Sequence, residues 1–281
     1  MLTVLEVIRK TSEFFASKSI DSPRLNAELV VGHALGLPRM RLYLEFERPL
    51  GDAEVAAIRE LVRRRGRREP LQHVIGRTEF FGLTLKTDRR ALIPRPETEL
   101  LVETVVARVG APPARILDLG TGSGAIALAL ARAFPGARVT AVDSSPDALA
   151  LASENAASAG LSDRVAFALS DWLGAIPGGE SFDLIVSNPP YLSAEETAAA
   201  APEVRDYEPA GALTAADGGF ADLERIARSS ARALAPSGML ALETGVGHHG
   251  RLASVLGEAG YSRVESLADL AGRDRFVLAW R

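Results

Sequence analysis

Apolar side chains recur at helical spacing in the first part of the chain. Three stretches carry hydrophobic residues three or four positions apart, at 2–15, 23–35 and 52–65. Such spacing gathers the apolar side chains on one face of a helix. Ser22 and Pro23 suit the cap and the first turn of the second helix. Because short turns separate the stretches, we predict a small helical bundle over residues 1–70.

The pattern changes after Pro70. Short β-rich pieces separated by glycines follow, and they lie at 73–75, 79–81 and 83–85. Pieces of this kind favour a hairpin or short paired strands. We therefore predict a β-hairpin linker over residues 71–92. A helix is predicted at 97–109, because Pro96 suits the first position of a helix.

From Ala114 onward, strand and helix patterns alternate. Strands rich in β-branched and aliphatic residues are predicted at 115–119, 138–143, 165–169, 182–187, 239–243, 262–266 and 275–280. The helices between them are predicted at 125–134, 146–159, 220–235 and 251–259. Repeated units of this kind form an α/β fold, a mostly parallel sheet that helices cover on both faces. Ligands of such sheets bind at the carboxyl ends of the strands, so the chemistry is expected at that edge.

Composition narrows the possible classes of function. The 281 residues are 47% hydrophobic and 24% charged, which is ordinary for a globular protein. The absence of cysteine excludes disulfides, thiolate zinc sites and a cysteine nucleophile. A formal net charge of −4 argues against a general nucleic-acid binder. No apolar run approaches the roughly 20 residues of a membrane span, and the N-terminus lacks the apolar centre of a signal peptide, so we expect a soluble cytoplasmic protein.

A glycine-rich loop follows the first predicted strand of the α/β region. It consists of Gly120, Thr121, Gly122, Ser123 and Gly124. Its spacing differs from the dinucleotide fingerprint, and no lysine of a phosphate-binding loop follows it. Backbone amides at the start of the next helix can hold a carboxylate, and Asp118 offers an acceptor for an ammonium group. A ligand with an amino-acid end therefore fits this loop better than a pyrophosphate does.

Acidic residues follow the next two predicted strands. Asp143 ends the second strand, where a carboxylate can accept hydrogen bonds from both hydroxyls of a ribose. Asp171 and Trp172 follow the third, where a carboxylate can accept from an adenine amino group and an indole can pack on a ring face. Each of these residues alone could be a turn or a helix cap. In this order after three successive strands, the set predicts a site for S-adenosylmethionine.

The fourth strand runs directly into Asn188, Pro189, Pro190 and Tyr191. Two prolines cannot continue a central strand, so the chain must leave the sheet here. The side-chain oxygen of Asn188 and the carbonyl of Pro189 can accept both N–H bonds of a planar NH₂ group, and Tyr191 supplies a flat ring. Held in this way, the nitrogen lone pair would point at a methyl sulfonium. The motif predicts methylation of an amino group but does not choose between a protein amide and a base.

These motifs together resemble the release-factor glutamine methyltransferases of the HemK or PrmC type. Beyond the motifs already described, the resemblance rests on segments at 70–76, 79–82, 93–99, 207–209, 217–218 and 269–275. It covers nearly the whole chain. It implies a Rossmann-like class I S-adenosylmethionine-dependent methyltransferase domain over residues 93–281, with a helical domain at 1–70 that recognises the substrate.

The resemblance also implies an activity and residue roles. The family transfers a methyl group from S-adenosylmethionine to the side-chain amide nitrogen (N5) of the glutamine in the Gly-Gly-Gln motif of class I peptide chain release factors. By resemblance, Asn188 and Pro189 hold that amide, Tyr191 packs on the glutamine side chain, and Leu92 forms the opposite wall. No metal is expected. The family often carries glutamines after a Glu-x-Gly, whereas here Glu243-Thr244-Gly245 leads to Gly247, His248 and His249, so that loop receives no role.

Two other reactions stay open. The same motif would serve glutamine N5-methylation of a ribosomal protein, or N6-adenine methylation of nucleic acid. The helical region and the linker favour release factors, whereas the net charge of −4 argues against nucleic acid. A module that only binds an adenosyl group would not need the Asn-Pro-Pro-Tyr motif beside its loop. We expect a monomer that binds no membrane and forms no stable complex with nucleic acid.

Overall fold

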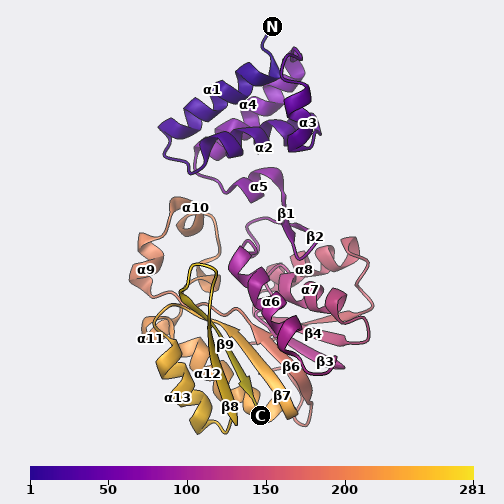
Figure 1. The fold of residues 1–281 in the computed structure, drawn as a ribbon, viewed down its shortest axis with the longest axis vertical. Helices are drawn as coiled ribbons and strands as arrows, with labels where there is room; N and C mark the ends of the chain where they lie inside the picture. The colour runs from indigo at the N-terminus through magenta and orange to yellow at the C-terminus, as the bar shows by residue number, and fades with distance from the viewer. The chain divides into compact units, whose positions relative to one another are not determined.

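The computed structural model describes all 281 residues, which form two compact units. The helical unit comprises Met1–Arg77 and Ala201–Tyr207. The sheet unit comprises Thr78–Ala200 and Glu208–Arg281, and Figure 1 labels the helices and strands of both. The segment 201–207 thus belongs to the helical unit, although it lies far along the chain from the rest of that unit.

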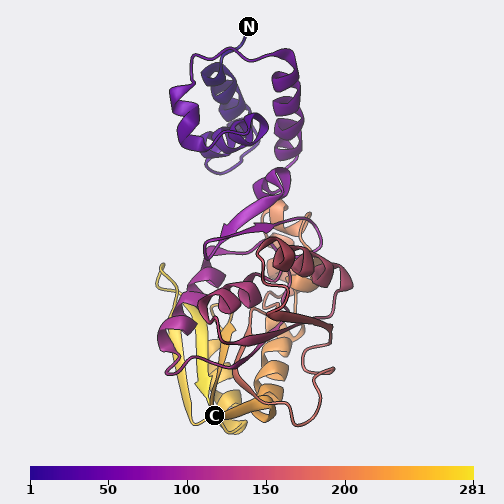
Figure 2. The same cartoon turned by 90° about the vertical axis from the view of Figure 1, so that its right-hand side faces the viewer.

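Helices near the N-terminus build the helical unit, as Figures 1 and 2 show. They are α1 (Val4–Ser17), α2 (Pro23–Leu35), α3 (Arg39–Leu44), α4 (Asp52–Gly66) and α5 (Leu71–Ile75). Their apolar side chains meet in one core, which includes Val4, Ile8, Phe15, Val31 and Leu42. Thr3 caps α1 by accepting a hydrogen bond from the backbone N–H of Glu6. The predicted bundle is confirmed, while α3 was not predicted because a helix of its length carries little periodicity.

The short helix α10 (Pro202–Arg205) completes the helical unit. Glu203 of α10 pairs with Arg65 of α4 at 2.9 Å and with Arg68 at 2.7 Å. The buried Arg65 guanidinium also donates to the side chain of Asn26 at 2.8 Å and to the carbonyl of Glu69 at 3.2 Å. Removing one partner of a buried ion pair leaves an uncompensated charge. Glu203 therefore holds α10 on the bundle.

The linker differs from its prediction at its start. The sequence pattern predicted a β piece at 73–75, but these residues belong to the helix α5. Val74 is buried in the core of the bundle, and Gly76 ends the helix with a φ of 81°. Packing therefore overrides the β propensity of this segment. The following residues form the predicted paired strands, β1 (Arg77–Phe80) and β2 (Leu83–Lys86).

A seven-stranded sheet forms the centre of the sheet unit. Its strands are β3 (Arg115–Leu119), β4 (Arg138–Asp143), β5 (Val165–Leu169), β6 (Phe182–Ser187), β7 (Leu234–Glu243), β8 (Arg263–Ala268) and β9 (Asp274–Trp280). Their spatial order is β5-β4-β3-β6-β7-β9-β8. The strands from β3 to β7 run parallel, and β9 runs antiparallel to both of its neighbours. Because β4 and β6 flank β3, the strand order reverses there, which is where such sheets bind ligands.

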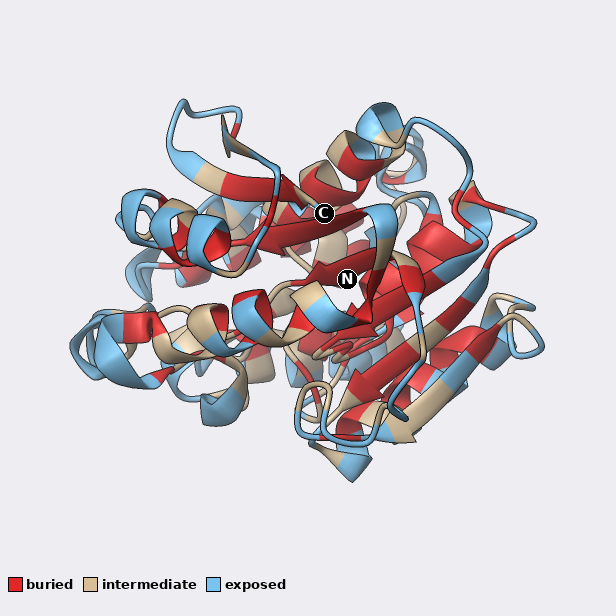
Figure 3. Cartoon of the chain, turned by 90° about the horizontal axis from the view of Figure 1, so that it is seen from below, coloured by how far each residue is buried: buried red, intermediate tan, exposed pale blue.

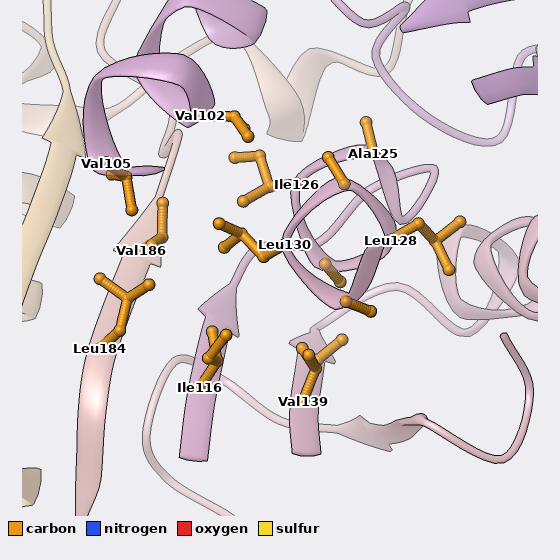
Figure 4. Packing of buried hydrophobic residues seen from close by; sticks show 14 of the residues in the cluster. Val102, Val105, Ile116, Ala125, Ile126, Leu128, Leu130, Val139, Leu184 and Val186 are labelled. Carbon is orange, nitrogen blue, oxygen red and sulfur yellow. The ribbon is translucent and has the colours of Figure 1, made fainter. Parts of the chain in front are cut away.

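Helices cover both faces of the sheet, so the predicted α/β fold is confirmed. They are α6 (Pro96–Arg108), α7 (Ala125–Ala133), α8 (Pro146–Ser158), α12 (Ala221–Ala233) and α13 (His249–Glu258). One core joins α6 and α7 to the strands, and Figure 4 shows its packing. A second core joins α12 and α13 to the strands. Neighbouring strand residues such as Ile116 and Leu117 divide between the two cores, as the alternation of a strand requires.

Short segments complete the sheet unit, namely α9 (Ala194–Ala199), the 3₁₀ turn η1 (Ala210–Ala212) and α11 (Ala216–Gly219). Figure 3 shows that the sheet is buried at its centre, where β3, β6 and β7 lie, while the outer sides of the helices are exposed. The edge strands β5 and β8 are mostly intermediate or exposed. None of the helices combines the length and the apolarity that crossing a membrane requires.

Candidate functional site

A cavity of about 340 Å³ lies at the carboxyl ends of the central strands of the sheet unit. Its volume falls in the range of small-molecule sites, roughly 300–1,000 Å³. Most of the site residues predicted from the sequence line this cavity, and they are Leu92, Gly120, Thr121, Gly122, Ser123, Asp143, Asp171, Trp172, Asn188 and Pro190. The predicted residues that do not line it are Asp118, Gly124, Pro189 and Tyr191. The fold therefore brings most of the predicted site to one place.

Steric crowding requires glycine at two positions of the loop after β3. Gly120 has a φ of 70°, and a Cβ on it would lie 3.1 Å from the ring of Trp172. Gly124 has a φ of 83°, and a Cβ there would lie 3.2 Å from the Cβ of Ala152 in α8. Residues with a Cβ adopt such a left-handed backbone only at a cost. The loop thus packs against α8 and the indole while its backbone follows the cavity wall.

Asp143 ends β4 with a half-buried carboxylate on the cavity wall. One of its oxygens accepts from the backbone N–H of Gly122 at 2.8 Å, and the other from that of Ser145 at 2.9 Å. Each carboxylate oxygen has a second lone pair that can accept a further bond. This geometry leaves room for the predicted contacts with ribose hydroxyls. It also gives Asp143 a role that the sequence did not indicate, since it fixes the glycine loop.

Asp118 supports the same loop from behind. Its side chain is fully buried, and one oxygen accepts from the hydroxyl of Thr121 at 2.7 Å and from the backbone N–H of Ala127 at 3.1 Å. Burial raises the pKa of this carboxyl to about 7, although both hydrogen bonds lower it. The other oxygen is buried without a partner. The carboxyl is not among the groups that line the cavity, and its predicted contact with a ligand's ammonium group stays a prediction.

Asp171 and Trp172 form the wall that follows β5. The Asp171 carboxylate accepts two hydrogen bonds from the Arg225 guanidinium, at 2.8 and 2.7 Å. The indole N–H of Trp172 donates to Asp222 at 3.1 Å, and Asp222 also lines the cavity. Sequence reasoning missed both partners because they lie about 50 residues away on α12. The polar groups of this wall are thus already engaged with α12, while the Trp172 ring lines the cavity.

Asn188 projects from the end of β6 onto the cavity wall. Its Nδ2 donates to the hydroxyl oxygen of Thr98 in α6 at 3.0 Å. The amide oxygen Oδ1 is therefore the end of the side chain left to accept from another donor. Pro190 lines the cavity beside it, whereas the Tyr191 hydroxyl turns away and donates to Glu243 at 3.0 Å.

A buried polar cluster lies behind Asn188. Thr98 is 5% exposed and Glu243 is 1% exposed, and the Thr98 hydroxyl donates to the second oxygen of Glu243 at 2.7 Å. Burial raises the pKa of Glu243, while the two hydroxyl donors and Arg275 oppose that rise. The Arg275 guanidinium lies 3.5 Å from the Tyr191 hydroxyl and donates to the carbonyl of Thr244 at 3.1 Å. The sequence motifs contain these residues, but nothing in their spacing indicated that they meet.

A second buried carboxylate supports another part of the wall. Glu208 is 6% exposed and accepts from the Arg95 guanidinium at 2.5 Å. Burial raises the pKa of Glu208 to about 7, because it outweighs the opposing effect of Arg95. The neighbours of this pair, Pro94 and Pro209, both line the cavity. The pair therefore joins two distant segments of the wall.

The donor set of the cavity fits a nucleoside that carries an amino-acid end. The loop presents backbone groups and small side chains at the start of α7, where a carboxylate is favoured. Asp143 offers acceptors for hydroxyl groups, and the Trp172 ring offers a flat apolar surface. The space in front of Gly122 is open, since a Cβ there would meet nothing closer than 3.8 Å. The residues present are thus compatible with S-adenosylmethionine.

Solved structures define the class of the fold. The chain is similar to the T. thermophilus 16S rRNA methyltransferase RsmC in complex with AdoMet and guanosine, with a TM-score of 0.53 and 21% identity over 73% of this chain and 49% of that one. It is also similar to the hMettl16 catalytic domain, with a TM-score of 0.57 and 19% identity over 82% of this chain and 80% of that one. The sheet unit has the fold of the class I S-adenosylmethionine-dependent methyltransferases.

Sequence comparisons define the family. The family model described as PrmC N-terminal domain matches residues 6–76, and the one described as Methyltransferase small domain matches residues 96–204. A release factor glutamine methyltransferase of Chlorobaculum tepidum is 43% identical over 97% of this chain and 95% of its own length. Its counterpart in Deinococcus radiodurans is 43% identical over 93% and 92%, and that of Salmonella typhimurium is 42% identical over 91% and 91%. The chain belongs to the release factor glutamine methyltransferase family.

Proposed function

We propose that this protein transfers a methyl group from S-adenosylmethionine to the side-chain amide nitrogen N5 of the glutamine in the Gly-Gly-Gln motif of class I peptide chain release factors. The observation that carries this proposal is the orientation of the Asn188 side-chain amide. Its Nδ2 is already bound to Thr98, so its Oδ1 is available on the wall of the cavity that the glycine loop also lines. An available amide oxygen suits the N–H of a planar amide.

The cofactor would lie along the glycine loop. We assign its carboxylate to the backbone amides of residues 120–124, its ribose to Asp143, and its adenine to the wall formed by Asp171 and Trp172. When bound, S-adenosylmethionine would supply an activated methyl group: its S–CH₃ bond breaks, the amide nitrogen forms the new bond to the methyl group and loses one proton to water, and S-adenosylhomocysteine leaves. We propose no metal in this reaction.

The substrate amide would lie between Asn188 and the opposite wall. Asn188 Oδ1 and the carbonyl of Pro189 accept its two N–H bonds and orient the nitrogen lone pair. Leu92 lines the cavity and limits the space around the glutamine side chain. The Tyr191 hydroxyl is held by its hydrogen bond with Glu243, and we assign its ring to packing on the glutamine side chain.

The partner of this reaction is a protein. We assign recognition of the release factor to the helical unit, which the PrmC N-terminal domain model matches over residues 6–76. The activity then belongs to the cytoplasm, where translation termination takes place. We propose a monomer that needs neither a membrane nor stably bound nucleic acid.

Methyl transfer to purified substrates tests this proposal. The intact protein is incubated with a class I release factor and isotope-labelled S-adenosylmethionine, and the modified residue is mapped by mass spectrometry. We expect one methyl group on the glutamine of Gly-Gly-Gln, and none on a release factor whose motif glutamine is replaced by alanine. Label on a ribosomal protein or on adenine, with none on the release factor, would overturn the proposal.

The role of Asn188 is tested separately. Asn188→Ala removes the orienting acceptor, so we expect loss of most transfer with the affinity for S-adenosylmethionine kept within about twofold. Calorimetry on the variant measures that affinity. A parallel loss of affinity and transfer would show that Asn188 serves the cofactor instead of the substrate.

A further inference from the structure

Three polar side chains from separate parts of the sheet unit are joined end to end. Asn188, after β6, donates from Nδ2 to the hydroxyl of Thr98 in α6 at 3.0 Å. Thr98 donates its own proton to Oε2 of Glu243, at the end of β7, at 2.7 Å. Both Thr98 and Glu243 are buried, so water does not compete for these bonds. The chain of bonds begins at the cavity wall and ends on a carboxylate.

The direction of this chain follows from its last member. A carboxylate can only accept hydrogen bonds, and a threonine hydroxyl has a single proton. Once that proton is given to Glu243, Thr98 can only accept from Asn188, which must present its NH₂ end. The other oxygen of Glu243 accepts from the Tyr191 hydroxyl, so both of its oxygens act as acceptors. The carboxylate thereby fixes which end of the Asn188 amide turns inward and which end faces the cavity.

We propose that Thr98 and Glu243 are positioning residues that set the amide of Asn188 with its oxygen toward the substrate nitrogen. The inference rests on the role proposed above for Asn188 and extends it to Thr98, which also lines the cavity, and to Glu243, which does not. If the direction of these hydrogen bonds were reversed, Asn188 would present N–H to the substrate N–H, and the two donors would repel each other. A one-way chain excludes that arrangement before the substrate binds.

The series of hydrogen bonds from Asn188 through Thr98 to Glu243 also changes the charge distribution at Asn188. With the substrate bound, its N–H, the Asn188 NH₂ and the Thr98 hydroxyl would all donate in one direction, and bonds in such a series polarise one another. Electron density thus increases at Oδ1, next to the nitrogen that becomes positive during transfer. The charged and titratable groups facing Glu243 are Glu97 from α6, Tyr191 from the segment after β6, and Arg275 from β9. Burial and Glu97 raise the pKa of Glu243, whereas the two hydroxyl donors and Arg275 lower it. The fixed direction described above holds while Glu243 is ionised.

Steady-state kinetics with three variants test the inference. Thr98→Val keeps the shape of the side chain and cuts the chain of bonds, so we expect kcat to fall about tenfold or more. Thr98→Ser retains the hydroxyl and should recover kcat to within about threefold of the wild type. Glu243→Gln offers either end of an amide to Thr98 and so no longer fixes the direction, and kcat should again fall. The KM for the release factor and the affinity for S-adenosylmethionine should change by less than about twofold.

Thr84→Val is the matched control. It also removes a threonine hydroxyl, but that hydroxyl is exposed and donates to Glu79 on the β1–β2 hairpin. We expect this variant to keep the wild-type kcat. Thermal unfolding of all variants establishes that they are folded under the conditions of the assay.

Nuclear magnetic resonance observes the hydrogen bond of the Asn188 side chain directly and without any ligand. The protein has only three asparagines, Asn26, Asn155 and Asn188, so selective ¹⁵N-asparagine labelling gives three side-chain NH₂ groups. The NH₂ of Asn188 should show one bonded, slowly exchanging proton in the wild type and in Thr98→Ser, and lose it in Thr98→Val. Asn26 and Asn155 donate to backbone carbonyls and serve as internal references, because their signals should not move.

The outcomes separate this inference from the function on which it rests. If Asn188→Ala keeps wild-type transfer, the role of Asn188 is wrong and the inference fails with it. If Asn188→Ala loses transfer while Thr98→Val stays within about twofold of the wild-type kcat, only the inference fails. It also fails if the Asn188 signals are the same in Thr98→Val as in the wild type, or if Thr98→Ser is as impaired as Thr98→Val.

Discussion

Replacing Asp143 with alanine is predicted to weaken binding of the cofactor by a calculable amount. The carboxylate is half-buried on the cavity wall and holds backbone N–H groups at 2.8 and 2.9 Å, so its position is fixed before a ligand arrives. Two ribose hydroxyls donating to it would form bonds to a charged group, each contributing about 1.5–3 kcal/mol when sheltered from water. Because the Asp143 carboxylate is partly exposed, water solvates it in the absence of ligand, and this offsets part of that free energy. We therefore expect a net loss of ~1–3 kcal/mol, which raises the Kd roughly 5- to 150-fold.

Isothermal titration of the intact protein with S-adenosylhomocysteine measures this loss. Asp147→Ala is the control, because it removes an exposed carboxylate from the first turn of α8 without touching the cavity. A cofactor analogue that lacks the ribose hydroxyls separates the two roles of Asp143. If the carboxylate acts through the ribose, Asp143→Ala should weaken the analogue far less than the parent compound. An unchanged Kd for the parent refutes the ribose contact, and equal losses for both ligands would mean that Asp143 acts only by holding Gly122.

Further predictions concern stability and the glycine loop. Because burial raises the pKa of folded Glu208 from 4.5 to about 7, its contribution to stability is complete below pH 4.5 and is lost as the pH rises to 7. The free energy of urea unfolding of Glu208→Gln, relative to that of the wild type, should therefore rise by ~2–3 kcal/mol between pH 4 and 8. A difference between the two proteins that does not change with pH would contradict this. Gly120→Ala should lower the free energy of unfolding by about 1–2 kcal/mol, because Gly120 has a left-handed backbone. The new Cβ would lie 3.1 Å from the Trp172 ring, so the fluorescence of Trp172 should shift. An unchanged spectrum would argue against that contact. Glu203→Ala leaves the buried Arg65 without its carboxylate partner, so hydrogen exchange should become faster in α4 and stay the same in β3 and β6.

The fold could be predicted largely from the sequence because its strands are short, apolar and separated by regular helices. The strands β3, β4, β5 and β6 have the predicted bounds, and the rule for parallel sheets then located the site at their carboxyl ends. The loop at 120–124 directly follows β3, Asp143 ends β4, and Asn188 directly follows β6. Their meeting at one cavity is therefore a consequence of topology, and no side-chain contact had to be known.

What the sequence did not reveal depends on contacts between distant segments. Residues 73–75 have β-forming side chains, but Val74 is buried in the bundle core and the segment is helical. Asp171 was expected to meet an adenine, yet its carboxylate already binds Arg225, which lies 54 residues away along the chain. Such pairs leave no trace in local spacing, because either partner alone is typical of an exposed helix or loop. Only the packing of α12 beside the end of β5 brings them together.

The burial of Glu243 is difficult to explain by stability alone. A carboxylate with 1% exposure is costly to desolvate, and replacing buried ion pairs with apolar residues often stabilises a protein. The structure reduces the cost in two ways: Thr98 and Tyr191 donate to its two oxygens, and Thr98 lies in the first turn of α6, where the helix dipole favours negative charge. Two neutral hydroxyl donors do not require a charged acceptor, since an amide oxygen would serve either of them. A carboxylate is required only if both donors must point the same way, toward it, and that requirement is the one that fixes the Asn188 amide with its oxygen on the cavity.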